Sequence, residues 1–447
     1  MERMSAADRL ERHYEEVAEC FEEASTGDYG ALVVPTGNSD EPMHRWFHLK
    51  EAFSYQLLPR VLKDTGLADL KELTVFEPFA GSGTVAATLV QMITDGQLSR
   101  ASYMGLEANP FLHLLSSAKL AAAQHPPTEF DALAASVVEA SQVVDPDSLE
   151  APALATFRSG YFDSDSLLGL LRLRQAIKGS PASSVERRLL MICLAATIEP
   201  SSFLRKDGRA LRRVTEPRTN DPFGWFKAIA EIVHEDLPRR PVSITGRSHH
   251  GDVRDFEVPP TDEAASDLSL FSPPYPNNID YTEVYKLETW FLNFINSHDE
   301  FRAQRRTSLR SHGSLKWQEE YRFHDSTHRR EIEDLVSPLL AVIPADRYRS
   351  ARRQLVLGYV DDMFTTLLKV ERCLRKGGQM VCVVGNSLHG SHDQQLLIAA
   401  DLLIARLSEL AGLNVDRLEV ARVPTRRRSA SRFLRETAIF ASKPASE

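Results

Sequence analysis

The residues best suited to chemistry are Ser272 to Tyr275, which read SPPY. Consecutive prolines stiffen the backbone and remove two amide donors, so the segment presents carbonyl oxygens and the Ser272 hydroxyl as fixed hydrogen-bond acceptors. The exocyclic amine of a nucleobase is a group that such acceptors would hold. Tyr275 adds a flat aromatic face on which a base lifted out of its stack can rest. We interpret Ser272, Pro273, Pro274 and Tyr275 as the candidate catalytic set.

A second candidate site is the glycine turn within Phe76 to Thr84, which reads FEPFAGSGT. Gly81 and Gly83 let the backbone approach a ligand closely and place the amides of the next helix against it. A phosphate-binding P-loop needs GxxxxGK[ST], which the absence of a following lysine excludes. The turn also satisfies GxGxxG/A, and Glu107 follows at about the 20-residue offset of a ribose-binding carboxylate. The turn alone leaves open NAD, S-adenosylmethionine and a purely structural turn.

Both candidate sites directly follow apolar segments that predict buried strands. Leu73 to Phe79 runs into the glycine turn, and a helix pattern, a second strand ending near Glu107 and another helix pattern come after it. Asp267 to Phe271 precedes SPPY, and Gly377 to Val384 and Thr437 to Ser442 predict further strands. Alternation of strands and helices predicts an α/β fold with a doubly wound sheet, which binds ligands at the carboxyl ends of its strands.

FEPFAGSGT followed at a distance by SPPY resembles the paired signatures FxGxG and [DNS]PP[YFW] of the S-adenosylmethionine-dependent amino-methyltransferases of DNA. Serine at the first position is most similar to the cytosine-N4 branch, whereas aspartate or asparagine is more usual in the adenine-N6 branch. The resemblance covers roughly residues 42–120, 249–290 and 356–444. It implies a Rossmann-like methyltransferase fold, with a mostly parallel sheet, a final antiparallel strand and two insertions, and S-adenosylmethionine as the cofactor.

The resemblance also implies which residues hold that cofactor. HRWFHLKEAFS, residues 44–54, is similar to the family's motif that closes over the methionine end, and Phe53 and Ser54 are its expected contacts. Asp252, in HHGDVRDF, is similar to the acidic residue that accepts from the cofactor's adenine. Glu107 would accept from the ribose hydroxyls. The expected cofactor-binding set is Phe53, Ser54, Glu77, Pro78, Phe79, Ala80, Gly81, Ser82, Gly83, Thr84, Glu107 and Asp252.

The chain divides into six predicted segments. A helical segment (1–40) precedes the cofactor-binding half of the methyltransferase domain (41–125) and a mainly helical insertion (126–245), the candidate target-recognition region. The catalytic SPPY half (246–296), a basic insertion (297–353) and the C-terminal strands (354–447) follow. Arginines outnumber acids locally in both insertions, as a cleft facing phosphates would require. The expected DNA contacts are Arg205, Lys206, Arg209, Arg212, Arg213, Arg302, Arg305, Arg306 and Arg310.

Composition excludes other classes of protein. The 447 residues carry a formal net charge of −9 and are 43% hydrophobic, which is typical of a folded globular chain. The four cysteines form no CxxC pair, so we expect neither a metal site nor disulfides. The N-terminus is an acidic amphipathic helix pattern without an apolar signal-peptide centre, and no stretch approaches the roughly 20 apolar residues of a membrane helix, so we expect a cytoplasmic protein.

The function predicted from these patterns is site-specific DNA methylation, with transfer of a methyl group to an exocyclic amine of a flipped base, preferentially N4 of cytosine. N6-adenine methylation and an RNA amino-methyltransferase are the alternatives of the same chemistry. A non-catalytic nucleic-acid binder that senses S-adenosylmethionine is the alternative from another class. An NAD-dependent dehydrogenase would leave SPPY and the arginine clusters unexplained. The expected partners are DNA and a cognate restriction or phage-defence system.

Overall fold

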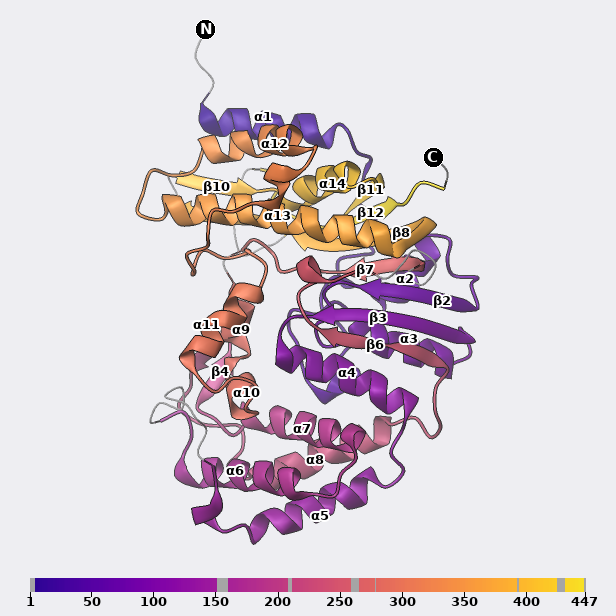
Figure 1. Ribbon diagram of the computed structural model, residues 1–447, viewed down its shortest axis with the longest axis vertical. Helices are drawn as coiled ribbons and strands as arrows, with labels where there is room; N and C mark the ends of the chain where they lie inside the picture. The colour runs from indigo at the N-terminus through magenta and orange to yellow at the C-terminus, as the bar shows by residue number, and fades with distance from the viewer. Residues whose placement is uncertain are drawn as a thin grey trace.

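The computed structural model describes residues 5–150, 160–207, 211–258, 265–277, 279–391, 394–423 and 431–445 (Figure 1). Within these residues, a central sheet is covered by helices on both faces. Its strands are β1 (Glu23–Ala24), β2 (Glu72–Glu77), β3 (Arg100–Glu107), β6 (Ile244–His250), β7 (Ser266–Phe271), β8 (Leu374–Gly385), β11 (Asn414–Arg422) and β12 (Glu436–Ser442). Two hairpins lie outside it, β4 (Leu204–Lys206) with β5 (Leu211–Arg213) and β9 (Ser387–Ser391) with β10 (Gln394–Ile398).

The helices fall into three groups along the chain. The first is α1 (Ala6–Ala18), η1 (His44–Trp46), α2 (Leu57–Asp64), α3 (Thr84–Thr94) and α4 (Pro110–Gln124). The second is α5 (Phe130–Gln142), η2 (Pro146–Ser148), α6 (Ser164–Gly179), α7 (Ser184–Ile198) and α8 (Pro222–Asp236). The third is η3 (Val253–Asp255), α9 (Tyr281–Val284), α10 (Lys286–Phe291), α11 (His298–Thr307), η4 (Arg322–Asp325), α12 (Arg329–Ala341), α13 (Arg349–Cys373) and α14 (Ala400–Leu410).

The strand order of the sheet is β1-β11-β12-β8-β7-β2-β3-β6. The strands from β8 to β6 are parallel, and β12 runs antiparallel to both of its neighbours, β8 and β11. This arrangement confirms the predicted Rossmann-like methyltransferase fold with a final antiparallel strand. Because β12 is reversed, its first residue, Glu436, pairs with the last residue of β8, Gly385, and so lies at the ligand-binding edge.

The two faces of the sheet bury separate apolar cores. Val75 of β2 packs into the core that includes α3, α4 and α7, whereas its neighbour Phe76 packs into the core that includes α13 and α14. Successive side chains of a strand point to opposite faces, which explains why an almost continuous apolar run is needed here. Within the described residues, no helix is long and apolar enough to cross a membrane.

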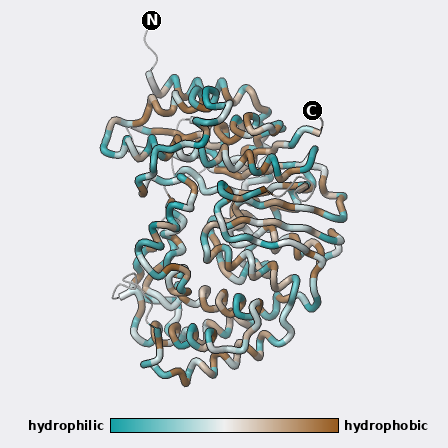
Figure 2. The backbone as a smooth tube through the Cα atoms, in the orientation of Figure 1, coloured by the Kyte–Doolittle hydropathy of each residue, from teal (hydrophilic) through white to brown (hydrophobic). Residues whose placement is uncertain are grey.

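The segment between α4 and β6 forms a helical layer below the sheet in the view of Figure 1, built from α5, α6, α7 and α8. In Figure 2 these helices alternate between hydrophobic and hydrophilic residues along their length, as amphipathic helices do. Their apolar faces join the core that contains Val75. The layer is therefore continuous with the sheet domain through one core.

Candidate active site

A cavity of about 360 Å³ lies at the edge where β2, β3 and β7 end. From the predicted cofactor set, its walls contain Pro78, Phe79, Gly81, Glu107 and Asp252, and from the predicted catalytic set they contain Ser272, Pro273, Pro274 and Tyr275. The structure therefore brings the glycine turn and SPPY, which are almost 200 residues apart in the sequence, into one cavity. Parallel strands end at the same edge of a sheet, which is the physical reason for this meeting.

The two glycines of the turn have different structural roles. Gly81 lines the cavity with a φ of 51°, and its N–H donates to the Glu107 carboxylate over 2.9 Å. Gly83 is the N-cap of α3 with a φ of 77°, and a Cβ there would lie 2.8 Å from Cα of Ser116 in α4. Gly83 thus permits close packing of α3 on α4, while Gly81 lines the cavity.

Glu107 ends β3 and accepts a second backbone N–H, from Asn109, over 2.8 Å. Desolvation of its carboxyl group raises its pKa to about 7, against the lowering effect of these backbone donors. The Asn109 side chain caps α4 through its oxygen, and its Nδ2 is buried without a hydrogen-bond partner in the structure. A carboxylate and an orphaned amide donor on the same cavity wall fit a ribose, which offers hydroxyls to both.

Glu77 lies behind the cavity wall rather than in it. Its side chain is buried and accepts a hydrogen bond of 2.6 Å from the Tyr103 hydroxyl. Burial raises the pKa of Glu77 well above its ordinary value, and it lowers the pKa of nearby Lys119 to about 7. Ala80, Ser82, Gly83 and Thr84 also do not line the cavity. These residues shape the turn from behind.

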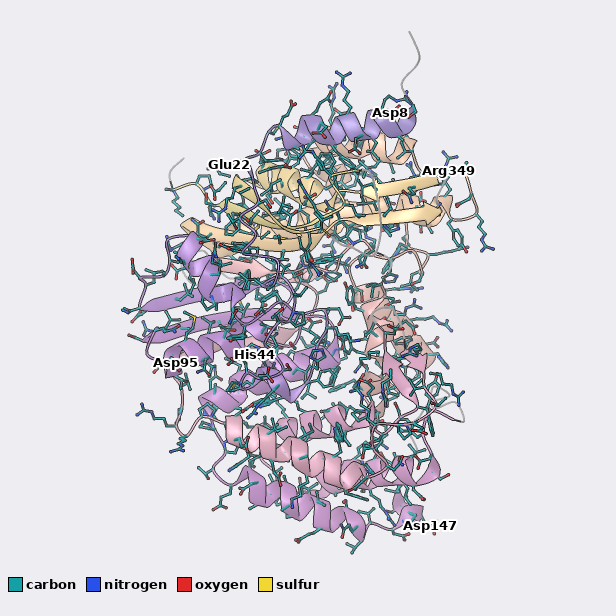
Figure 3. The ribbon with its side chains drawn as sticks, turned by 180° about the vertical axis from the view of Figure 1, so that it is seen from behind. Asp8, Glu22, His44, Asp95, Asp147 and Arg349 are labelled. Carbon is teal, nitrogen blue, oxygen red and sulfur yellow. The ribbon has the colours of Figure 1, made fainter. Side chains whose placement is uncertain are left out.

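The segment 44–54 is anchored to the helical layer by Asp236 of α8. That carboxylate accepts from the Met43 N–H at 2.9 Å, from the Trp46 indole at 2.9 Å and from the Arg45 guanidinium. Figure 3 shows His44 in the interior of the molecule, and burial lowers the pKa of its imidazole to about 3. The part of the segment that lines the cavity is residues 49–52.

Phe53 and Ser54, the expected contacts at the methionine end, are both buried outside the cavity lining. The Ser54 hydroxyl donates to the Thr36 carbonyl over 2.7 Å, which holds the loop in place. We therefore revise the expected contact from Phe53 and Ser54 to the four residues that precede them. The family resemblance located the segment, but the loop turns inward after Ala52.

Asp252 lines the cavity and is part of an ion-pair network. Its carboxylate accepts from the Arg254 guanidinium, and the same guanidinium pairs with Asp362 of α13 at 2.8 Å. Arg254 also donates to the carbonyls of Thr307 and Ser308 at 3.0 and 3.2 Å. Since Thr307 and Ser308 line the cavity as well, this network holds the end of α11 in the cavity wall.

The SPPY loop is fixed from two sides. The carbonyl of Pro276 accepts from the Ser387 hydroxyl at 2.7 Å, and Nε2 of His389 lies 2.7 Å from the same oxygen. The Tyr275 hydroxyl donates to the Glu436 carboxylate over 2.7 Å. Burial and the nearby Glu436 charge raise the pKa of Tyr275 well above its ordinary value, so the phenol stays protonated.

The predicted DNA contacts separate into a buried or half-buried group that is held by partners within the protein and an exposed group. Lys206 pairs with the fully buried Glu288, Arg305 pairs with Asp280 at 2.6 Å, and Arg310 pairs with Asp361 and Asp362. Arg205 donates to the carbonyls of Glu199, Ser202 and Leu204. These four cations stabilise the protein interior, so we no longer expect them to contact DNA.

The exposed cations are the remaining candidates for contact with a polyanion. They are Arg212, Arg213, Arg302 and Arg306, whereas Arg209 lies outside the described residues. Arg212 and Arg302 each lie 3.4 Å from an exposed carboxylate, that of Asp207 and that of Asp299 respectively. Exposed pairs of this kind are worth little, so their charge stays available.

Sequence reasoning missed several residues of the cavity wall. They are Asn109, Gln304, Thr307, Ser308, Ser311, His312, Arg422 and Glu436. Gln304 stands out because both its amide nitrogen and its oxygen are buried without a partner in the structure. No local motif marks these positions. Only the reversed direction of the last strand could have pointed to Glu436, because it places the start of that strand at the ligand edge.

A Rossmann-like sheet with a reversed last strand, an acidic residue at the end of β3 and SPPY after β7 is the arrangement that the resemblance to methyltransferases leads us to expect. The chain is similar to the type II methyltransferase M.BsoBI of Geobacillus stearothermophilus, with 24% identity over 427 residues that cover 85% of this chain and 80% of that protein. It is also similar to the type II methyltransferase M.AvaI of a Nostoc strain, with 23% identity over 90% of this chain and 84% of that protein. The resemblance stated from the sequence is thereby confirmed.

Two other comparisons carry less weight. No family model matches the chain. The rRNA methyltransferase aviRa from Streptomyces viridochromogenes aligns with 88% of this chain and 85% of that chain at 10% identity, and the TM-score is 0.26. A value this low supports no argument about the fold, which follows from the strand order itself.

Proposed function

We propose that this protein transfers a methyl group from S-adenosylmethionine to an exocyclic amine of a base in DNA, preferentially N4 of cytosine. The observation that carries this proposal is the meeting of SPPY and the glycine turn in one cavity. The names of M.BsoBI and M.AvaI as type II methyltransferases support the same activity. Serine in the first position of SPPY favours cytosine through the family resemblance.

Glu107, Gly81 and Asn109 would hold the ribose and the residues around Asp252 would hold the adenine, as the cavity lining allows. When bound, S-adenosylmethionine supplies a methyl group carried on a sulfonium. Residues 49–52 would close the opposite side of the cofactor site.

The amine is a poor nucleophile because its lone pair is delocalised into the base ring. The Ser272 hydroxyl and the Pro273 carbonyl would accept its two N–H groups and favour the tetrahedral geometry in which the lone pair is available. The Tyr275 ring would stack on the flipped base and orient it. Positioning by these groups supplies the main part of the rate, and no covalent intermediate with the protein is required.

The exposed arginines Arg212, Arg213, Arg302 and Arg306 would contact the phosphate backbone. Arg212 and Arg213 come from β5 in the first insertion, and Arg302 and Arg306 come from α11 in the second, so both insertions would contribute to DNA contact. A cognate restriction or phage-defence system stays a prediction.

The test is transfer of tritiated methyl groups to unmethylated bacterial DNA and, in parallel, to total RNA, with mass spectrometry of the nucleosides. We expect N4-methylcytosine in DNA, and Ser272→Ala should reduce it. N6-methyladenine would keep the mechanism and correct the base. Label in RNA alone, or cofactor binding without any transfer, would contradict the proposal.

A further inference from the structure

We propose that Glu436 is a positioning residue that acts through Tyr275 to fix the Ser272 hydroxyl as an acceptor for the reacting amine. This inference rests on the proposed function. Glu436 follows Tyr275 by 161 positions in the sequence, yet the two side chains are in contact. All three side chains line the cavity.

Glu436 has a defined environment. Glu436 is 5% exposed. Each of its two carboxylate oxygens contacts another side chain. Oε1 accepts from the Tyr275 hydroxyl at 2.7 Å, and Oε2 pairs with Nε of Arg422. A guanidinium is always protonated, so the contact between Arg422 and Oε2 is an ion pair in which the carboxylate accepts.

The direction of the hydrogen bonds follows from these partners. An ionised carboxylate only accepts, so the Tyr275 proton must point at Glu436. The Tyr275 oxygen is then available as an acceptor, and Oγ of Ser272 donates to it at 3.2 Å. With its only hydrogen directed at Tyr275, Ser272 offers only lone pairs to a ligand, which an amine N–H requires.

The ring of Tyr275 is held in the orientation that this chain of hydrogen bonds needs. A Cβ on Gly385 would lie 2.9 Å from ring atoms Cδ2 and Cε2 of Tyr275, so the absence of a side chain there lets the ring reach Glu436. Gly385 is the register partner of Glu436 across β8 and β12. The sheet itself therefore sets the distance between the phenol and the carboxylate.

The substitution Glu436→Gln reverses the chain of hydrogen bonds. The new side-chain amide would turn its oxygen toward the Arg422 guanidinium and its NH₂ group toward Tyr275. The Tyr275 hydroxyl would then accept from that NH₂ group and donate to Ser272, whose own hydrogen would face the amine. Two donors facing each other oppose binding in the reactive geometry, and we expect kcat to fall by about 10- to 100-fold.

Tyr275→Phe removes the link and leaves the Ser272 hydroxyl free to rotate, so we expect a loss of less than about tenfold. The double variant Y275F/E436Q should match Y275F and therefore be more active than E436Q, because the reversal is no longer transmitted. Glu419→Gln is the matched control, since Glu419 is buried on β11 and contacts Thr26 rather than the cavity. The affinity for S-adenosylmethionine should stay within about twofold in all four variants.

Carbon-13 labelling of the tyrosine ζ position gives a readout without substrate. The signal that disappears in Y275F identifies Tyr275, and it should shift in E436Q but not in E419Q. Additive losses in the double variant, or an unshifted signal in E436Q, would overturn this inference alone. Absence of methyl transfer by the wild-type protein would overturn the proposed function, and the role assigned to the amine with it.

Discussion

The carboxylate of Glu107 accepts the backbone N–H of Gly81 over 2.9 Å and thereby ties the end of β3 to the glycine turn that follows β2. Its other oxygen accepts from Asn109 at 2.8 Å. These contacts hold the carboxyl group at the cavity wall in a poorly solvated position, which raises its pKa to about 7. The group therefore titrates in the pH range in which an enzyme is ordinarily assayed.

We expect the affinity for S-adenosylmethionine to rise with pH through the pKa of Glu107. Above about pH 7 the ionised carboxylate would accept from both ribose hydroxyls, whereas below about pH 7 the proton would occupy one acceptor site. Only about a tenth of the Glu107 carboxyl groups are ionised at pH 6, whereas most are ionised at pH 8. The dissociation constant for S-adenosylmethionine should therefore be about tenfold larger at pH 6 than at pH 8. Titration calorimetry at several pH values across this range measures the dissociation constant.

Glu107→Gln is the control for that titration. The side-chain amide has nearly the same shape and does not titrate, so binding should be weaker and nearly independent of pH between 6 and 8. Asp252, whose carboxylate is paired with Arg254, is left unchanged in this variant. An equal pH dependence in wild type and E107Q would assign the titration to another group.

Tyr275→Ala should separate methyl transfer from cofactor binding. Loss of base stacking costs about 1 to 3 kcal/mol, which lowers transfer by about 5- to 150-fold. The cofactor's expected contacts, Glu107 at the end of β3 and Gly81 in the turn after β2, lie outside the SPPY loop and should stay in place. Filter binding of labelled S-adenosylmethionine together with the transfer assay decides the point. An equal loss of cofactor affinity would contradict the separation of the two subsites.

Gly83→Ala should destabilise the protein more than Gly96→Ala. Both glycines have φ values near 75°, so a side chain costs about 1 to 2 kcal/mol of backbone strain at either position. At Gly83 the new Cβ would also meet Ser116 of α4 at 2.8 Å, whereas at Gly96 nothing lies within 4 Å. We expect an additional loss of at least about 1 kcal/mol in the free energy of unfolding by urea for Gly83. Equal losses would show that α4 moves aside without cost.

The parts of the site that the sequence predicts are those that short motifs mark. SPPY and FEPFAGSGT each follow an apolar strand, and a parallel sheet brings the ends of such strands together regardless of their separation in the chain. The strand before Asp252 escapes prediction, because β6 reads ITGRSHH and its side chains are largely polar or exposed. An edge strand buries too little for an apolar pattern to be required.

The residues that the sequence could not place are those whose role depends on long-range partners. Lys206 and Arg310 occur in arginine-rich segments that look like phosphate contacts, yet Glu288 and Asp362 neutralise them in the folded chain. A local count of charges cannot see a carboxylate 82 or 52 positions away. Glu436 is missed for the same reason, since it begins β12 and its partner Tyr275 lies in the loop after β7.

Lys206→Met should destabilise the fold rather than weaken DNA contact alone. The Glu288 carboxylate is fully buried, with Oε1 paired to Lys206 and Oε2 without a hydrogen-bond partner in the structure. Removing the cation leaves a buried unpaired charge, which costs about 3 to 5 kcal/mol. Urea unfolding measures the loss, which should be smaller at pH 5 than at pH 8 because a protonated Glu288 carries no charge.

The double variant K206M/E288L is the counterpart of that measurement. Replacing both members of a buried ion pair by apolar side chains should recover most of the stability. If K206M alone unfolds no more easily than the wild type, Lys206 does not stabilise the fold. It then returns to the set of expected DNA contacts.

The double variant R302A/R306A should weaken DNA binding and flatten its dependence on salt. Both arginines are exposed on α11, whose last residue, Thr307, lines the cavity, and Arg302 lies beside the exposed Asp299. Each phosphate interaction that the substitutions remove should reduce the slope of log affinity against log salt concentration by about 1. Arg330→Ala is the matched control, because Arg330 is an exposed arginine on α12, which packs against α1 at the top of Figure 1 and contributes no residue to the cavity lining. Fluorescence anisotropy between about 50 and 200 mM salt measures the DNA affinity of each variant. An unchanged slope in R302A/R306A would show that DNA does not contact α11.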